Sequence, residues 1–471
     1  MTTASIVLGR AAPPGDIPPS RPGARPSYER TAPPAAGTTR KAPSPPAASP
    51  RHRPRIPEET ENTMDHLGEL KEFARLHARG QGISERQVAA VLPRITNDVP
   101  GHPSSWARVW TAEADRLAFE GRSLDACRRY ALARFPYHGD DVRRRAQDNC
   151  VRTFDDWRRR RGVERMVLDH PDGTVACWTS GLDTRRRRPL LLIMGGIVSV
   201  KEQWAPLLPR LARLGYAAVA TEMPGVGENT LRYHADSWRL LPFLMDRLAD
   251  RARVSDTSVL GLSFSGHLAL RAAADDPRIR SVHTVGAPVA GFFTDPVWWP
   301  RVPEITVETL CRLTGAADDN ELRALLADFV LGPDVLDAVD IPVGYVVSSR
   351  DEIIPPTERQ LLGSALPRVR FKEFDDVHGS PAHLGAMRKW LIGSLLRARL
   401  TNRVGGRRTL PTAGARRSPV EPGAVAVTPG ATVPFGAASV TASGATSPSG
   451  PVAAAGFADA GSRRPHPAPA D

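Results

Sequence analysis

The spacing of apolar residues changes once along the middle of the chain, from a helical period to short apolar runs. Between about residues 64 and 162, apolar residues recur at helical spacing; Trp106, Trp110, Ala114 and Leu117, for example, share one helix face. A second amphipathic segment, residues 121–138, is expected to end near its proline, because proline breaks a helix interior. Runs typical of strands are nearly absent here. We therefore predict an all-helical N-terminal domain over residues 64–165 that caps the rest of the body.

After this region, short β-rich runs alternate with helical segments. Several runs are continuously apolar, as expected when both faces of a parallel sheet are covered. The alternation predicts an α/β domain over residues 166–400, built on a doubly wound, mostly parallel sheet. The expected strands are 163–169, 174–178, 190–194, 216–221, 257–261, 281–286, 343–348 and 369–374, and the expected helices are 203–214, 234–251, 266–274 and 380–398.

One stretch interrupts this alternation. Residues 290–338 are rich in aromatic residues at their start and helical in pattern further on. Insertions of this kind commonly form lids near a catalytic face, so we predict a lid here. Within it, Trp298 and Trp299 either line a substrate pocket or pack the lid itself.

The two ends of the chain differ in composition from its middle. Residues 1–63 and 401–471 together hold 24 of the 45 prolines, but few of the aromatic residues. Such segments bury too little apolar surface to offset chain entropy. We predict two disordered tails, one rich in Pro, Arg and Ala (1–63) and one rich in Ala, Gly and Pro (401–471).

The net charge of +12 is shared among three parts of the chain. Each tail carries four more basic than acidic residues, which leaves +4 for the folded body. Binding to nucleic acid would need a basic face on a folded module, and no motif of that kind is found in the sequence. We therefore expect no nucleic-acid partner.

Cysteine usage and the N-terminal sequence argue against several further classes. Cys127, Cys150, Cys177 and Cys311 are widely spaced and form no C-x-x-C pair, so we expect neither a metal site nor a disulfide framework. The N-terminus lacks the basic and apolar segments of a signal peptide, and no run of about 18 apolar residues exists. A soluble cytoplasmic protein that does not contact membranes is the expectation.

The strongest chemical signal is the segment Thr257–Leu270, TSVLGLSFSGHLAL. It places Ser263 between a β-branched apolar run and an amphipathic helix, with Gly261 two residues earlier. On such a nucleophile elbow the serine hydroxyl projects from a sharp strand-to-helix turn beside the N–H groups of the helix start. The pattern departs from G-x-S-x-G at Ser265, which we expect to be structural, with Gly266 one place later.

Two further polar residues follow predicted strands. Asp351 follows the run VGYVVSSR, and His378 lies in the loop DDVHGSP after the run VRFKEF. The chain order Ser, Asp, His is that of α/β hydrolases. We predict a catalytic triad in which His378 takes the proton of Ser263 and Asp351 orients the imidazole.

An acyl-transfer site also needs donors for the developing oxyanion. The apolar run 190–194 leads directly into two glycines, which allow a close approach of backbone to substrate. The expected donors are the N–H group of Phe264 and that of Gly196 or Ile197.

Other residues compete for these roles. His383 is an alternative base, but we expect it in the first turn of the last helix. Glu352 and Asp376 are alternative acids, and we expect both to be solvated loop residues.

Two runs of four arginines, Arg158–Arg161 and Arg185–Arg188, flank the start of the sheet. Charge runs of this kind are usually solvated. A sharper hypothesis is that they dock an anionic partner such as an acyl carrier protein. A small-molecule substrate is expected in either case, and a homodimer is a candidate assembly.

The motifs between residues 100 and 400 resemble those of the FrsA-like α/β hydrolases, a group that includes 2,6-dihydropseudooxynicotine hydrolase and fungal pigment hydrolases that shorten polyketide chains. The resemblance rests on the helical segment WARVWTAEADRLAFEGRSLDACRRYALARFPYH and on IMGGIVSVKEQW, ATEMPGVGEN, GLSFSGHLALRAAADDPRI, SSRDEIIP and DDVHGSP. The pattern G-G-x-x-S-x-K-E at Gly195–Glu202 is more specific than the elbow. Glu222 departs from the family, in which an aspartate commonly precedes the P-G-x-G turn.

The resemblance implies a helical domain that covers the α/β core, with the active site between them. It also implies cleavage of an ester, a thioester or a carbon–carbon bond beside a ketone in a small aromatic or polyketide-like substrate. Carbon–carbon cleavage would benefit from an extra acid, for which Asp295 is a candidate. We thus expect a cofactor-independent serine hydrolase; the alternative is a non-catalytic ligand- or partner-binding protein on the same fold.

Overall fold

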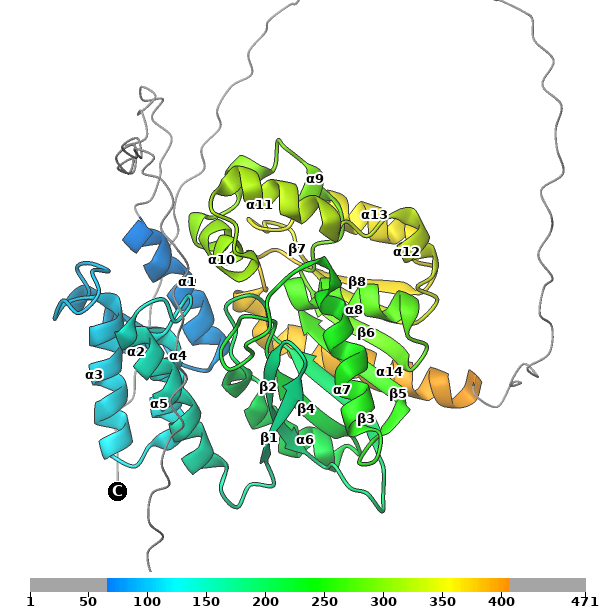
Figure 1. Ribbon diagram of the computed structural model, residues 1–471, viewed down its shortest axis with the longest axis horizontal. Coiled ribbons are helices and arrows are strands. Elements are labelled where there is room, and N and C mark those ends of the chain that lie inside the picture. Colours follow the sequence, from blue (N-terminus) through cyan, green and yellow to red (C-terminus); the bar gives the residue numbers. More distant parts are fainter. Residues whose placement is uncertain (1–65, 406–471) are drawn as a thin grey trace, which may run out of the picture. The chain divides into compact units, whose positions relative to one another are not determined.

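The computed structural model describes residues 66–405 (Figure 1). The first predicted tail, 1–63, lies outside the described residues, as does the second, 401–471, beyond residue 405. Residues 66–392 belong to one compact unit that holds both the helical region and the sheet. The described part of the second unit, from Gly393, is the C-terminal part of the last helix.

The N-terminal region is helical, as the periodicity predicts. The apolar face of α3 is buried through Trp106, Trp110, Ala114 and Leu117. The Asp140 carboxylate accepts the first N–H groups of α5 and so fixes where that helix begins. The elements are α1 (His66–Gly80), α2 (Glu85–Ala89), η1 (Leu92–Arg94), α3 (Trp106–Phe119), α4 (Ser123–Ala133) and α5 (Asp141–Arg158).

An eight-stranded sheet follows, and its strands coincide with the eight predicted apolar runs. The strand order is β1-β2-β4-β3-β5-β6-β7-β8, with β3 to β8 parallel and β1 and β2 antiparallel to their neighbours. The bounds are β1 (Glu164–His170), β2 (Gly173–Ser180), β3 (Pro189–Met194), β4 (Ala217–Thr221), β5 (Arg253–Leu262), β6 (Ile279–Val285), β7 (Val343–Ser348) and β8 (Val369–Phe374). The predicted α/β class with a mostly parallel sheet is confirmed.

Helices cover the sheet, and two are shorter than the sequence predicts. The expected helix 203–214 is divided by Pro206 and Pro209 into two 3-10 turns, η2 (Lys201–Gln203) and η3 (Ala205–Leu207), and the helix α6 (Leu208–Arg213). The predicted helix 234–251 contains η4 (Ala235–Arg239) and α7 (Leu240–Leu248). The other two are longer than predicted: α8 (Phe264–Asp275) extends beyond 266–274 at both ends, and α14 (Leu384–Gly405), after η7 (Pro381–His383), continues past residue 398. Figure 1 shows α7 and α8 in front of the sheet. On the β6–β8 side, Met387 and Leu391 of α14 pack with Val285, Val346 and Phe374.

The stretch 290–338 is a helical insertion between β6 and β7. It contains α9 (Gly291–Thr294), η5 (Trp299–Arg301), α10 (Glu304–Thr314), α11 (Asp319–Leu326), η6 (Ala327–Phe329) and α12 (Pro333–Asp337), whereas α13 (Thr357–Ala365) connects β7 to β8. The insertion meets the N-terminal region at α1, where the Ile305 N–H donates to the Glu69 carboxylate across 3.3 Å.

The topology sets the position of the site. Strand β4 lies on one side of β3 and β5 on the other, so the chain changes direction between β3 and β5. Loops that follow the carboxyl ends of two such strands diverge and leave a crevice between them. The loops after β3, β5, β7 and β8 all emerge at this same edge, because these strands are parallel.

Candidate active site

Ser263 occupies the turn between β5 and α8. Its backbone has φ 58° and ψ −130°, a left-handed conformation that is costly for a residue with a side chain. The turn is held by the Ser263 N–H, which donates to the Val285 carbonyl at 2.8 Å. A Cβ at Gly261 would lie 2.6 Å from the Ser265 carbonyl oxygen, so this turn requires glycine two residues before the serine. The strained serine is the geometry that a nucleophile elbow needs.

The departure at Ser265 is accommodated by hydrogen bonds. The Ser265 hydroxyl is buried and lies 2.8 Å from the Met194 carbonyl and 3.0 Å from the Leu262 carbonyl. The close helix-to-strand contact is made one place later, because a Cβ at Gly266 would lie 2.0 Å from Thr284 Oγ1. Ser265 therefore has a structural role, as the sequence predicts.

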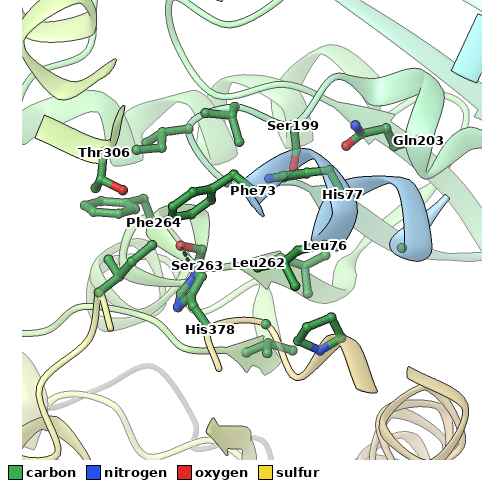
Figure 2. A pocket seen from close by; sticks show the side chains of 18 of the residues that line it. Phe73, Leu76, His77, Ser199, Gln203, Leu262, Ser263, Phe264, Thr306 and His378 are labelled. Atoms are coloured by element: carbon green, nitrogen blue, oxygen red, sulfur yellow. Dashed lines mark hydrogen bonds between the residues drawn. The ribbon is translucent and has the colours of Figure 1, made fainter. Parts of the chain in front are cut away.

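The structure brings Ser263, His378 and Asp351 together from three strand ends. His378 Nε2 lies 3.0 Å from Ser263 Oγ, and its Nδ1 lies 2.9 Å from both carboxylate oxygens of Asp351 (Figure 2 shows the serine and histidine). The Asp351 Oδ1 also accepts the N–H groups of Ile353 and Ile354 at 3.0 and 2.8 Å, which fix the carboxylate. This arrangement can move a proton from the serine to an oriented imidazole.

Electrostatics favour a basic imidazole. Burial lowers the pKa of His378, but the Asp351 charge and hydrogen bond, together with the Glu352 charge, outweigh burial and raise the pKa above its ordinary value. Glu352 accepts the His378 backbone N–H at 2.9 Å, and burial raises the pKa of the Glu352 carboxyl. Glu352 is half-buried and hydrogen-bonded to the loop that carries His378, so it is less solvated than the sequence interpretation expects.

The predicted oxyanion donors lie beside the serine. Gly196, Ile197 and Phe264 all line the cavity that contains Ser263. A Cβ at Gly196 would be 3.1 Å from the Ser263 Cβ, so the glycine allows the backbone to approach the nucleophile. Phe264 is the first residue of α8, and the first N–H groups of a helix have no partner within the helix. The loop and the helix start can both direct donors toward a carbonyl oxygen.

The loop after β3 that carries Gly196 and Ile197, called the oxyanion loop below, is held in place by Arg134 of the helical region. Its guanidinium Nη1 donates to the Val198 carbonyl at 2.7 Å, and the residue is 1% exposed. Burial lowers the pKa of Arg134 to about 10, although the Glu222 charge partly opposes this change, so the group remains a cation near neutral pH. Sequence analysis missed Arg134, because it appears there as one of several arginines in an amphipathic segment.

A buried charge cluster lies under the same loop. The Lys201 ammonium contacts Glu202, Glu222 and Glu228 at 3.0, 3.3 and 2.7 Å. Burial opposes the charged ammonium, but the three carboxylates raise the pKa of Lys201. A Cβ at Gly227 would lie 2.0 Å from the Glu222 carboxylate, so the P-G-x-G turn makes room for this glutamate. Lys201 is the lysine of the G-G-x-x-S-x-K-E pattern, so this motif is the feature of the sequence that could have indicated the cluster.

Ser263 and His378 open into a mostly apolar cavity with a volume of about 170 Å³. Apolar cavities of ~150 Å³ can hold a benzene molecule, so there is room for a group the size of one aromatic ring. The walls come from α1, the loop after β3, the insertion and the start of α14. Figure 2 shows Phe73, Leu76 and His77 of α1 gathered around it with the serine and the histidine. The helical region therefore forms part of the site.

Three residues that the sequence offered only as candidates for the pocket, Asp295, Trp298 and Trp299, are not among the residues that line the cavity of Ser263. The Asp295 carboxylate accepts the N–H groups of Val297 and Trp298 within its own turn. The Trp298 indole N–H donates to the Ile353 carbonyl at 2.8 Å, and Trp299 packs on Phe292. Proximity in sequence to the lid did not reveal which way these side chains face.

The competing base and acid form a separate pair. His383 Nδ1 lies 2.9 Å from the Asp376 carboxylate, and His383 stacks on Phe374. Asp376 is buried and also accepts two backbone N–H groups, so its interpretation as a solvated residue is wrong. This pair is bonded internally and makes no hydrogen bond to Ser263 among the residues described.

The arginine runs lie at the opposite edge of the sheet. Arg158–Arg161 precede β1 and Arg185–Arg188 precede β3, and both strands begin at the edge away from Ser263. Several of these side chains bond within the chain: Arg158 to Asp155, Arg187 to the Ala249 carbonyl and Arg188 to the Ala212 carbonyl. Within residues 66–405, no cluster of acidic, His or Cys side chains is placed to hold a metal ion. Nor does any described helix have the length and apolar character to cross a membrane.

Comparison with protein families and curated proteins gives consistent results. A family model described as Esterase FrsA-like matches residues 105–364, a span that includes Ser263 and Asp351 and ends before His378. Esterase FrsA of Enterobacter sp. is 26% identical over 237 residues, or 48% of this chain and 57% of that protein. Hydrolase acrC of Aspergillus aculeatus is 29% identical over 265 residues, or 45% of this chain and 59% of that protein. The chain thus spans less than two thirds of the length of these relatives.

Solved structures agree on the fold. AbyA5 is 46% identical, with a TM-score of 0.69, over 73% of this chain and 98% of that one. A 2,6-dihydroxy-pseudo-oxynicotine hydrolase is 20% identical, with a TM-score of 0.57, over 72% of this chain and 98% of that one. The second likeness concerns the fold alone. The family resemblance inferred from the motifs is confirmed.

Proposed function

The chain belongs to the FrsA-like esterase family, and from this premise we propose that it is a cofactor-independent serine hydrolase of small molecules. The observation that supports this most strongly is the hydrogen-bonded series Ser263, His378, Asp351, with the serine at positive φ beside an apolar cavity. These three residues act as nucleophile, general base and orienting carboxylate.

The reaction proceeds in two acyl-transfer steps. His378 Nε2 takes the Ser263 proton as the serine oxygen attacks the substrate carbonyl, and the N–H groups of Phe264 and of Gly196 or Ile197 stabilise the oxyanion. Collapse releases the alcohol or thiol, which carries away the proton held by His378. Water, deprotonated by the same imidazole, then cleaves the acyl-enzyme to give the acid and free serine.

An ester or thioester with an apolar acyl group is the substrate class that fits best. The cavity is mostly apolar and accommodates about one ring beside the nucleophile. A carrier protein docked at the arginine runs would sit at the edge opposite Ser263, so a free small molecule is favoured over a carrier-bound one.

Cleavage of a carbon–carbon bond beside a ketone is a second candidate, supported by Glu352. This reaction needs an acid to protonate the departing carbon, and Asp295 is not in the cavity lining whereas Glu352 is. Burial raises the pKa of Glu352 above its ordinary value, the direction that a proton donor needs.

The test is hydrolysis by the full-length chain and by Ser263→Ala. The substrates are 4-nitrophenyl 3-phenylpropanoate, the matching N-acetylcysteamine thioester and 1-phenylbutane-1,3-dione. We expect serine-dependent release of 4-nitrophenol or thiol. Serine-dependent conversion of the diketone into an acid plus a ketone would instead make carbon–carbon cleavage the main activity. Equal rates for the wild type and Ser263→Ala on every substrate would favour a non-catalytic binding protein.

A further inference from the structure

A second histidine faces the reaction cavity from the helical region. His77, near the end of α1, lines the cavity together with Ser263 and His378, and its ring centroid lies 4.9 Å from that of Phe135 (Figure 2). Among residues 66–405, no hydrogen bond to either ring nitrogen of His77 is found, whereas His378 uses both of its nitrogens. His77 therefore retains hydrogen-bonding capacity inside the cavity.

The surroundings of His77 keep its ring uncharged. Burial lowers its pKa to about 4, and the neighbouring His378 and Arg134 charges act in the same direction. A neutral imidazole presents one N–H donor and one nitrogen acceptor. It can therefore bind a hydroxyl or a carbonyl without placing a net charge next to the catalytic base.

Most of the cavity wall has no such capacity. The side chains nearest to His77 along α1, Phe73 and Leu76, are apolar, as are Phe135, Ile197, Ile305 and Met387 on other walls. In a pocket of this kind a few polar groups fix the orientation of the ligand. A ligand with no polar atom opposite His77 would displace water from the imidazole and leave it without a hydrogen-bond partner.

We propose that His77 is a specificity-determining residue that hydrogen-bonds an oxygen of the substrate remote from the carbonyl attacked by Ser263. The enzyme thereby prefers an acyl group that carries a hydroxyl or carbonyl at that point over its apolar isostere. This inference rests on the proposed hydrolase function and adds the chemical class of the acyl group.

The experiment compares matched esters and matched variants. The substrates are 4-nitrophenyl 3-arylpropanoates whose ring carries hydrogen, or a hydroxyl or acetyl group at the ortho, meta or para position. The enzymes are the wild type, His77→Phe, His77→Gln and the control Arg79→Gln, which changes an exposed side chain of the same helix outside the cavity lining. The quantity measured is the ratio of kcat/KM for each substituted ester to kcat/KM for the parent ester.

The wild type should favour at least one substituted ester about tenfold or more. His77→Phe should bring that ratio to within about twofold of one, His77→Gln should retain part of it, and Arg79→Gln should leave it unchanged. Equal losses on all esters in His77→Phe would show that the histidine only packs the cavity and would overturn the proposal. Wild-type ratios near one for every substituent would also overturn it.

A binding measurement separates this inference from the reaction itself. Titration calorimetry of Ser263→Ala, with and without His77→Phe, uses the 3-arylpropanoic acids as probes. Tighter binding of one substituted acid that disappears in His77→Phe supports the proposal even if the wild type hydrolyses no ester. Identical affinities for the parent and all substituted acids contradict it. Far-UV circular dichroism and Tm identify any variant that does not fold. If His77→Phe does not fold, the comparison of His77→Gln with the wild type tests the proposal instead.

Discussion

The helical region and the α/β region each contribute a histidine to one cavity, and the two histidines differ in almost every physical respect. His378 follows a strand, uses both ring nitrogens and has a raised pKa because of carboxylates beside it. His77 lies on a helix, uses neither nitrogen among the described residues and has a pKa lowered by burial. Pairs of groups with separated pKa values commonly divide roles in a site. The difference suggests that the α/β region carries out the reaction, whereas the helical region shapes the cavity and selects the substrate.

The largest effect is expected within the α/β region. Asp351→Asn should lower kcat about 10⁴-fold, because the asparagine no longer holds the imidazole in the required tautomer. The matched control is Asp376→Asn, which changes a carboxylate at the same 2.9 Å from another histidine, His383. Steady-state kinetics should show less than about a tenfold loss for the control. Similar losses in both variants would mean that Asp351 has no special role.

A smaller loss of kcat is expected when Arg134 of the helical region is replaced. Arg134→Met removes the donor that holds the Val198 carbonyl, so the oxyanion loop shifts and kcat should fall about 10- to 100-fold with KM nearly unchanged. Arg143→Met is the control, because that buried arginine pairs with Asp98 and Asp140 instead. Both variants should lose stability, measured as Tm, and Arg134→Met alone should lose kcat. An unchanged kcat in Arg134→Met would mean that the helical region selects the substrate but does not support the reaction.

The pH profile compares the two histidines directly. Protonated His378 cannot accept the serine proton, so kcat/KM should be lost as pH falls through the raised pKa, with a midpoint above about 6.5. Glu352→Gln should move this midpoint to lower pH, because the Glu352 charge contributes to the raised value. His77→Gln should leave it in place, since His77 is already neutral there. A midpoint that moves in His77→Gln but not in Glu352→Gln would reverse the assignment of the two histidines.

Stability toward acid tests whether the two regions behave as one unit. Burial lowers the pKa to about 4 for His77 and His138 in the helical region and for His267 and His283 in the α/β region. The unfolded chain binds protons below pH ~6.5 where these side chains do not, so stability is lost as pH falls from about 6.5 toward 4.

Urea unfolding between pH 7.5 and 4.5 should show one transition whose free energy of unfolding drops by a few kcal/mol, since each pKa unit corresponds to about 1.4 kcal/mol. His283→Phe, which removes one of these histidines, should reduce the drop. Two separate transitions would show that the helical region unfolds alone and that its contacts with the cavity are loose.

The α/β region and the helical region also differ in how much of each the sequence could predict. All eight strands and the positions of Ser263, Asp351 and His378 follow from apolar runs that end in polar residues, because parallel strands bring their carboxyl ends to one edge. The order of polar residues along the chain then sufficed to assemble the site.

Helical residues gave no comparable signal. Arg134 reaches a carbonyl 64 positions away, and His77 faces a cavity most of whose other walls lie more than 100 residues further on. A helix pattern shows which face is buried but not what that face meets. For a related reason the sequence left open whether Asp295 and Trp298 face the substrate, since local hydrogen bonds and the Ile353 carbonyl determine their direction.

The proposed mechanism requires Ser263 to be an activated nucleophile in the wall of this cavity. Its most direct test is peptide mapping by mass spectrometry after treatment of the folded full-length chain with a fluorophosphonate. We expect a single phosphonyl adduct on Ser263, formed much more slowly in His378→Ala. A folded protein that takes up no label, or that is labelled at another serine at the same rate in Ser263→Ala, would contradict it.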